Sequence, residues 1–184
     1  MELLENHKFE EIRTLFWRNS NLNFNNPFSL IKSLEEKPQT GWLRKIHECE
    51  DERALKYFLK DKSFINFDFE KKTLGLLWEC CQIPDFVKKT YGNHYEVIGN
   101  VFKFLSSEKG QITDEYMRLQ LMKLDKLEGN VDSLSNRIAN VRTWSYVSNK
   151  NNWIENQDYW IEKTKHLEDR LSDRLHEELT KTFI

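Results

Sequence analysis

The strongest candidate for chemistry in this sequence is a group of cationic and aromatic residues in its C-terminal half. Arg142, Tyr146 and Lys150 stand at i, i+4 and i+8, which places them on one face of a helix, and Trp153 follows just beyond. Cations on such a face can contact phosphates while a ring offers a platform for a stacked base. We therefore treat these four residues, the basic-aromatic face, as a candidate nucleic-acid-binding site.

The residues around this face carry no acid. From Ser133 to Ile154 the 22 residues contain no Asp or Glu, whereas 30 of the 184 residues of the chain are acidic. The alternative interpretation is structural: Tyr146 and Trp153 pack inside, and the aliphatic stems of Arg142 and Lys150 cover them. Spacing alone leaves both interpretations open.

The motifs of catalysis are incomplete. A phosphate-binding loop requires a Gly-Lys dipeptide, and the sequence has none. The acidic string Glu50–Arg53 resembles a helicase magnesium motif but continues as the start of a helix. His176 begins a zincin-like pattern, but Thr180 occupies the position of its second histidine. We expect no catalytic residue, no metal site and no cofactor in the isolated chain.

Composition limits the classes of partner. The 28 basic and 30 acidic residues give a net charge of −2, so any contact with nucleic acid must be local. A mean hydropathy of −0.74 and the lack of a long apolar run argue against a membrane partner. Three cysteines, two of them adjacent at Cys80 and Cys81, fit reduced and mostly buried thiols.

Few turn residues and helical periodicity favour helices throughout. With 6 Gly and 3 Pro, a β-sandwich or barrel has too few turn residues. In the first half we expect an Asn-rich loop, an N-cap at Asp51 and these helical segments: Leu3–Arg18, Phe28–Glu36, two short helices within Trp42–Lys60, and one through Leu74 to Cys81.

The second half predicts longer helices. We expect Pro84 to open a helix that ends near Leu105 and Thr113 to cap one that ends near Leu127. Two helices then follow, over about 132–148 and 157–182, with Leu171 of the last pressed against apolar residues of the first. The predicted fold class is all-α, a multi-helix bundle of about seven or eight helices of mixed length with a long C-terminal helix.

Several strings resemble one known family. The segment from Arg137 to Ile184, with its Arg-Thr-Trp, Tyr-Val-Ser and Glu-Asp-Arg-Leu-Ser-Asp-Arg-Leu-His-Glu-Glu-Leu steps, is similar to the C-terminal region of the mitochondrial degradosome RNA helicase subunit and its bacterial relatives. DERALKYFLKD from Asp51 and LLWECCQIPDF from Leu76 resemble the preceding segment of that family in the same order. The resemblance covers residues 42–184, and residues 1–41, the N-terminal helices and Asn-rich loop, match less clearly.

The resemblance implies an accessory helical region of an ATP-dependent, superfamily-two RNA helicase without its two RecA-like motor domains. It implies single-stranded RNA and the motor domains, in cis or in trans, as partners. It also implies a cytoplasmic location, or the mitochondrial matrix in a eukaryote. The competing hypothesis is a protein-interaction module that docks on a helicase or another partner without contacting nucleic acid.

Overall fold

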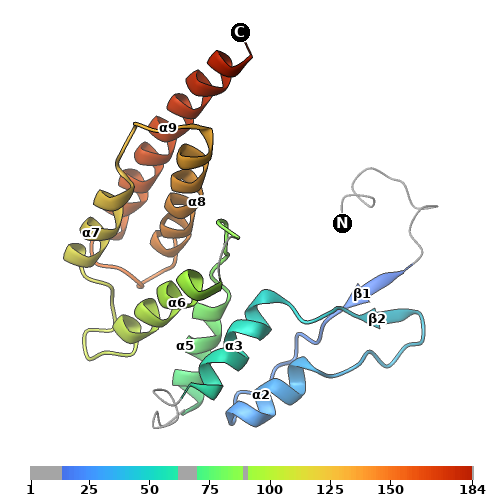
Figure 1. Ribbon diagram of the computed structural model, residues 1–184. Helices are drawn as coiled ribbons and strands as arrows, with labels where there is room; N and C mark the ends of the chain where they lie inside the picture. The colour runs from blue at the N-terminus through green and yellow to red at the C-terminus, as the bar shows by residue number, and fades with distance from the viewer. Residues whose placement is uncertain (1–13, 62–69, 89–90, 184) are drawn as a thin grey trace. The chain divides into compact units, whose positions relative to one another are not determined.

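The computed structural model describes residues 14–61, 70–88 and 91–183. In these ranges the regular structure is seven helices and two short strands (Figure 1). The all-α class with a long C-terminal helix is confirmed. The chain divides into two compact units, Met1–Cys81 and Gln82–Ile184, whereas the sequence suggested a boundary after residue 41.

The two strands lie where the sequence suggested helix. Strand β1 (Leu15–Trp17) pairs in parallel with β2 (Leu43–Lys45), and Leu15 lies opposite Leu43. The helix expected to reach Arg18 is therefore wrong over its last residues, while residues 3–13 lie outside the described part. The first of the two short helices expected after Trp42 is also wrong. Strands of three residues carry no readable period, and their hydrogen bonds come from a distant partner.

The Asn-rich segment is the expected loop, and it ends by capping a helix. The side chain of Asn26 accepts a hydrogen bond from the backbone N–H of Ser29 at 2.8 Å, at the start of α2 (Pro27–Leu34). Pro27 suits the first helical position because its missing N–H has no helical partner to lose. Asn19 donates to the carbonyl of Ser33, which ties the loop to that helix.

Two further helices complete the core of the first unit. Helix α3 (Glu50–Lys60) packs on α2 and on α5 (Lys71–Cys81). The buried apolar residues of these helices are Leu30, Leu34, Ala54, Leu55, Phe58, Leu74, Leu77, Trp78, Cys80 and Cys81. Cys49, and not Asp51, is the N-cap of α3, since Asp51 lies in its first turn.

The second unit begins with a turn instead of the expected helix start at Pro84. The carboxylate of Asp85 accepts hydrogen bonds from the backbone N–H groups of Val87 and Lys88. Helix α6 therefore spans only Tyr91–Leu105. Helix α7 (Asp114–Leu124) is capped by Thr113 as expected, through a hydrogen bond from the N–H of Tyr116.

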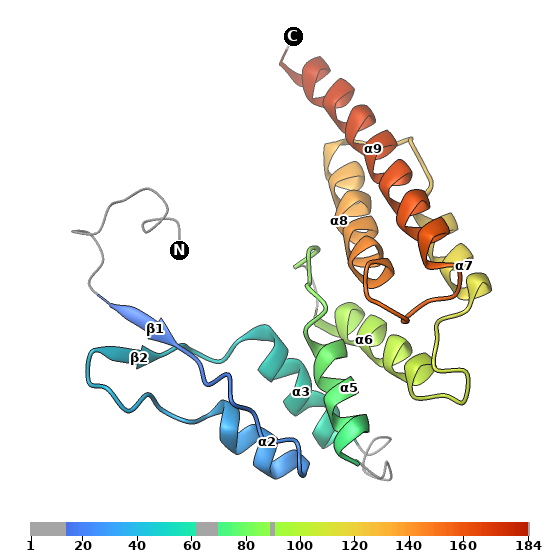
Figure 2. The same cartoon turned by 180° about the vertical axis from the view of Figure 1, so that it is seen from behind.

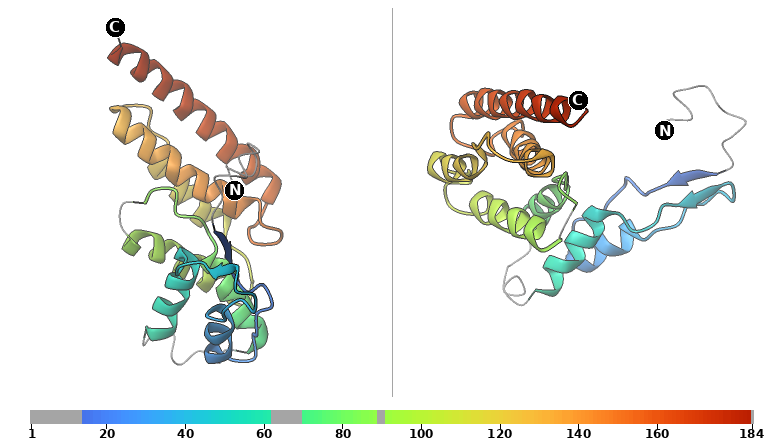
Figure 3. Two further views of the ribbon diagram at one scale, coloured as in Figure 1. Left: turned by 90° about the vertical axis from the view of Figure 1, so that its right-hand side faces the viewer. Right: turned by 45° about the horizontal axis from the view of Figure 1, so that its top comes forward.

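The last two helices pack along each other. Helix α8 (Val131–Ser148) and helix α9 (Gln157–Thr182) lie side by side, and both views show it (Figures 1 and 2). Helix α7 packs on α8, and Figure 3 shows these three ribbons, yellow to red, gathered together. Leu134 and Val141 of α8 and Leu171 of α9 are fully buried. This confirms the expected apolar seam.

No helix of the described segments is both long enough and apolar enough to cross a membrane.

Candidate nucleic-acid interface

The structure brings three of the four predicted residues together at the C-terminal end of α8. Tyr146 lies in the last turns of the helix, Lys150 directly follows the C-cap Asn149, and Trp153 lies in the turn that leads to α9. The ammonium nitrogen of Lys150 is 5.5 Å from the ring centroid of Tyr146 and 5.4 Å from that of Trp153. Both distances are within the range of cation–π attraction, so the cation is held over two rings.

Trp153 belongs to the core. Its side chain is only 5% exposed. Its backbone carbonyl accepts a hydrogen bond from the N–H of Ile112 at 2.8 Å, next to an isolated parallel bridge between Ile112 and Ile154. A buried ring has no face for a stacked base, so Trp153 supports Lys150 and cannot itself be a stacking platform.

The turn that carries Lys150 is fixed by hydrogen bonds. The side-chain nitrogen of Gln157 donates to the carbonyl oxygens of Ser148 and Lys150, each at 3.0 Å. The N–H of Lys150 in turn donates to the carbonyl of Val147. Because these contacts position the backbone before any ligand arrives, binding at Lys150 requires little ordering of the chain.

Arg142 lies on the exposed side of α8 with its own acidic partner. Its Nε donates to Glu168 of α9 at 2.8 Å, and 53% of the arginine side chain remains exposed. An exposed ion pair is typically worth about 0–1 kcal/mol, so a phosphate can compete for this guanidinium. Of the four predicted residues, Arg142 and Tyr146 lie within α8, one turn apart, as their spacing of four residues predicts.

In the acidic string of the first unit, Asp51 forms an ion pair with an arginine. The carboxylate of Asp51 is bound by both terminal nitrogens of Arg18, at 2.8 and 3.0 Å. The guanidinium of Arg18 also lies 5.5 Å from the ring centroid of Trp78. A helix start is therefore confirmed here, and Asp51 is engaged by an arginine.

Glu52, the next residue, is unusual because it is buried without a partner. It is 1% exposed, and neither carboxylate oxygen has a hydrogen-bond partner. Burial raises its pKa above the ordinary value, against the opposing influence of Lys45, Arg18 and Lys56. Sequence reasoning missed this residue because nothing in the sequence distinguishes one buried acid from the exposed acids beside it.

The described ranges hold no metal-ligand group, and two of the three cysteines are buried. No group of three His, Cys, Asp or Glu residues there is placed to hold a metal ion. Cys80 and Cys81 are buried, and burial raises the pKa of the Cys81 thiol. A buried thiol with a raised pKa is a poor nucleophile, because the thiolate is the reactive form.

Two hollows in the second unit also escaped sequence reasoning. One lies between α7 and α9 and includes the exposed side chains of Met122 and Tyr159. The other is a cleft among α6, α7 and α8 with several asparagine and glutamine side chains in its lining. The asparagines of α8 at i and i+4, Asn136 and Asn140, were the only signal in the sequence for the second hollow.

No family model, curated protein or solved structure matches this chain. The resemblance to the helicase C-terminal region accordingly stays a prediction.

Proposed function

We propose that this chain is an accessory helical region of an ATP-dependent RNA helicase, which binds single-stranded RNA and packs against the motor domains without hydrolysing ATP itself. The observation that carries the proposal is the position of Lys150, a cation held over two rings by a fixed turn at the end of an acid-depleted helix.

The geometry suggests a role for each residue of the basic-aromatic face. Lys150 and Arg142 supply charges for two phosphates of one strand, and Tyr146 stands between them in the sequence. The half-buried Tyr146 contributes part of its ring to a base or ribose. The ring of Trp153 attracts the ammonium of Lys150, and Gln157 fixes the backbone of Lys150 through its carbonyl.

The experiment compares variants of the full chain for binding to a fluorescent single-stranded RNA. Arg142→Ala and Lys150→Ala should each weaken binding about threefold to tenfold, because each removes one phosphate contact. Arg170→Ala is the matched control, since Arg170 is also an exposed arginine of this unit, paired with Asp125 at 3.1 Å. Arg170→Ala should bind like the wild type. Equal affinities for all four proteins would contradict the proposed site.

A protein-interaction module is the second candidate, and the hollow between α7 and α9 favours it. Met122 is 64% exposed and Tyr159 is 57% exposed, on either side of that hollow. Exposed apolar side chains around a groove are typical of docking surfaces. Apolar docking should be nearly insensitive to salt, whereas phosphate binding is strongly sensitive.

A further inference from the structure

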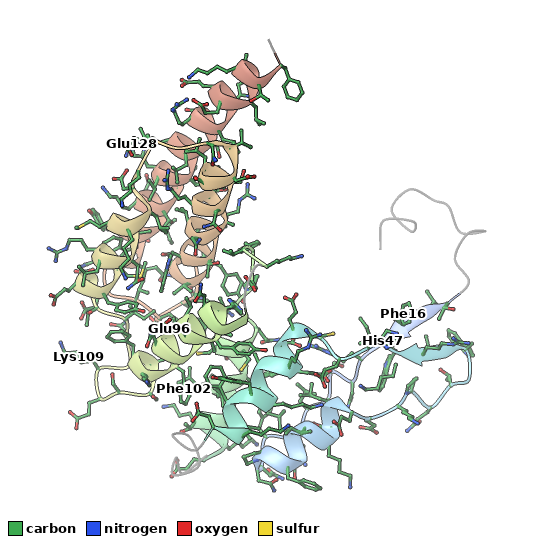
Figure 4. The ribbon with its side chains drawn as sticks, viewed as in Figure 1. Phe16, His47, Glu96, Phe102, Lys109 and Glu128 are labelled. Carbon is green, nitrogen blue, oxygen red and sulfur yellow. The ribbon has the colours of Figure 1, made fainter. Side chains whose placement is uncertain are left out.

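The cleft among α6, α7 and α8 is lined by amides from all three helices. Its volume is about 810 Å³, which falls within the ordinary size of ligand sites. The five amide side chains, which define the amide cleft, are Asn93, Asn100, Gln120, Asn136 and Asn140. Glu96 of α6, labelled in Figure 4, also lines it.

One of these amides has an unmet hydrogen-bonding requirement. The side-chain oxygen of Asn136 is buried and has no hydrogen-bond partner. The backbone carbonyl of the same residue accepts from the side-chain nitrogen of Asn140 at 2.8 Å, which orients the second amide. A buried acceptor without a partner is destabilising, so a ligand group that reaches and donates to Asn136 recovers that loss.

Aromatic side chains form part of the wall of the amide cleft. Tyr116 and Trp144 both line it, with ring centroids 5.9 Å apart, and Phe104 packs on Tyr116 at 4.7 Å. Burial raises the pKa of Tyr116, and its hydrogen bond with Asn100 opposes this rise. The hydroxyl therefore stays protonated and can act as a donor at neutral pH.

The charges around the cleft argue against a phosphate as its ligand. Its charged lining is Lys123 against Glu96 and Asp85, so cations are not in excess. Amides present donors and acceptors together, and paired donors and acceptors match the edge of a nucleobase. Sequence-specific recognition of single-stranded RNA works through such edges, with the base removed from its stack.

The cleft lies next to one end of the basic-aromatic face, the end formed by Tyr146 and Lys150. Thr143 lines the cleft, and Tyr146 follows it by three residues, on the next turn of the same helix. Arg142 faces Glu168 of α9 instead. The strand therefore reaches the cleft from Lys150, whose ammonium lies over the ring of Tyr146. We propose that the amide cleft receives one base of the single-stranded RNA and reads its edge by hydrogen bonds. This inference rests on the proposed function.

The test compares two ten-nucleotide oligomers with the full chain at one salt concentration. One is oligoadenylate, and the other is the same ribose-phosphate strand without bases. Wild-type protein should bind oligoadenylate about tenfold more tightly, as expected for one stacked and hydrogen-bonded base. Equal affinity for the two oligomers would contradict base binding in the amide cleft but would leave the proposed phosphate binding intact. Failure to bind either oligomer would overturn both.

Variants of the cleft amides test whether the preference for oligoadenylate over the abasic strand arises in the amide cleft. Asn136→Leu and Gln120→Leu replace amides on two different helices by apolar groups of similar size. Each should reduce the preference about fivefold and leave binding of the abasic strand unchanged. Asn151→Leu, at an exposed asparagine outside the cleft, is the control and should keep the full preference. Circular dichroism confirms that each variant is folded, and a preference that survives in both folded amide variants contradicts the proposal.

Discussion

Arg142 shows how a binding residue can be masked by its own neighbour. Its partner Glu168 comes from α9, which carries acids along its exposed side, among them Glu162 and Asp169. The carboxylate of Glu168 competes with phosphate for the guanidinium and repels the strand as well. The net charge near Arg142 is therefore smaller than the acid-free stretch of α8 suggests.

Removal of this competing carboxylate should strengthen RNA binding. We expect Glu168→Gln to raise the affinity for single-stranded RNA about twofold to threefold, measured by fluorescence anisotropy at low salt. Asp125→Asn, which removes the partner of Arg170, should leave the affinity as it is. If Glu168→Gln weakens binding, the ion pair orients Arg142 instead of masking it.

The raised pKa of Glu52 should make the free energy of unfolding depend on pH. Because its pKa is raised by burial, the folded chain binds its proton more tightly than the unfolded chain. The contribution of Glu52 to stability is therefore present below its unfolded pKa, about 4.3, and is lost as the pH rises through the folded pKa.

A neutral isostere should remove this dependence. Glu52→Gln should raise the free energy of unfolding at pH 7 by about 1 kcal/mol and change it little at pH 4, because a buried amide costs less than a buried charge. Urea titrations at both pH values measure it. Glu50→Gln, an exposed neighbour in the same helical turn, should have no such effect. A loss of stability at pH 7 in Glu52→Gln would show that the charge is satisfied in solution.

Sequence reasoning placed the residues of helix α8 well and those beyond it poorly. Arg142 and Tyr146 share a helix, so their spacing fixes their relative direction. Trp153 follows the helix end, where spacing no longer sets direction, and the bridge between Ile112 and Ile154 decides its burial. The amide cleft draws on three helices, so its lining depends on tertiary packing that no local pattern contains.

At the scale of elements, α9 is buried along only part of its apolar stripe. Leu167 and Leu171 are buried, whereas Leu175 and Leu179 are half-buried. The stripe has the same period throughout, so the sequence predicts the helix and its inner face but not how far its partner covers it.

Because Leu171 is fully buried and Leu179 is not, truncating the two side chains to alanine should destabilise the fold by different amounts. Leu171→Ala should lower the free energy of unfolding by about 2–5 kcal/mol, since a fully buried side chain leaves a cavity. Leu179→Ala should cost less than half as much. Thermal or urea unfolding of both variants is the measurement. Equal losses would mean that the C-terminal half of α9 is as fully packed in solution as Leu171.

The elements that sequence reasoning missed depend on partners. β1 exists because β2 pairs with it, and residues Leu15–Trp17 alone have no period that distinguishes strand from helix. The turn before α6 forms because Asp85 binds two following N–H groups, which outweighs the preference of Pro84 for a helix start. Helices α7, α8 and α9 were predicted to within a few residues, because the Thr113 cap and long apolar stripes are local signals.

At the scale of the molecule, we expect no ATP hydrolysis by the purified chain, with or without RNA. The sequence has no Gly-Lys dipeptide, and without a phosphate-cradling loop the outer phosphates have no site. A phosphate-release assay with and without single-stranded RNA measures this. RNA-stimulated turnover that persists through repurification would contradict the accessory role.

The dependence of RNA affinity on salt tests the central claim most directly. The chain carries a net charge of −2, so strong salt dependence can come only from a local cationic surface. We expect the logarithm of the association constant for single-stranded RNA to fall linearly with the logarithm of salt concentration, with a slope of several units. Arg142→Ala should flatten that slope by about one unit. Absence of RNA binding, or binding that salt leaves unchanged, would contradict the account and favour a module that docks on protein.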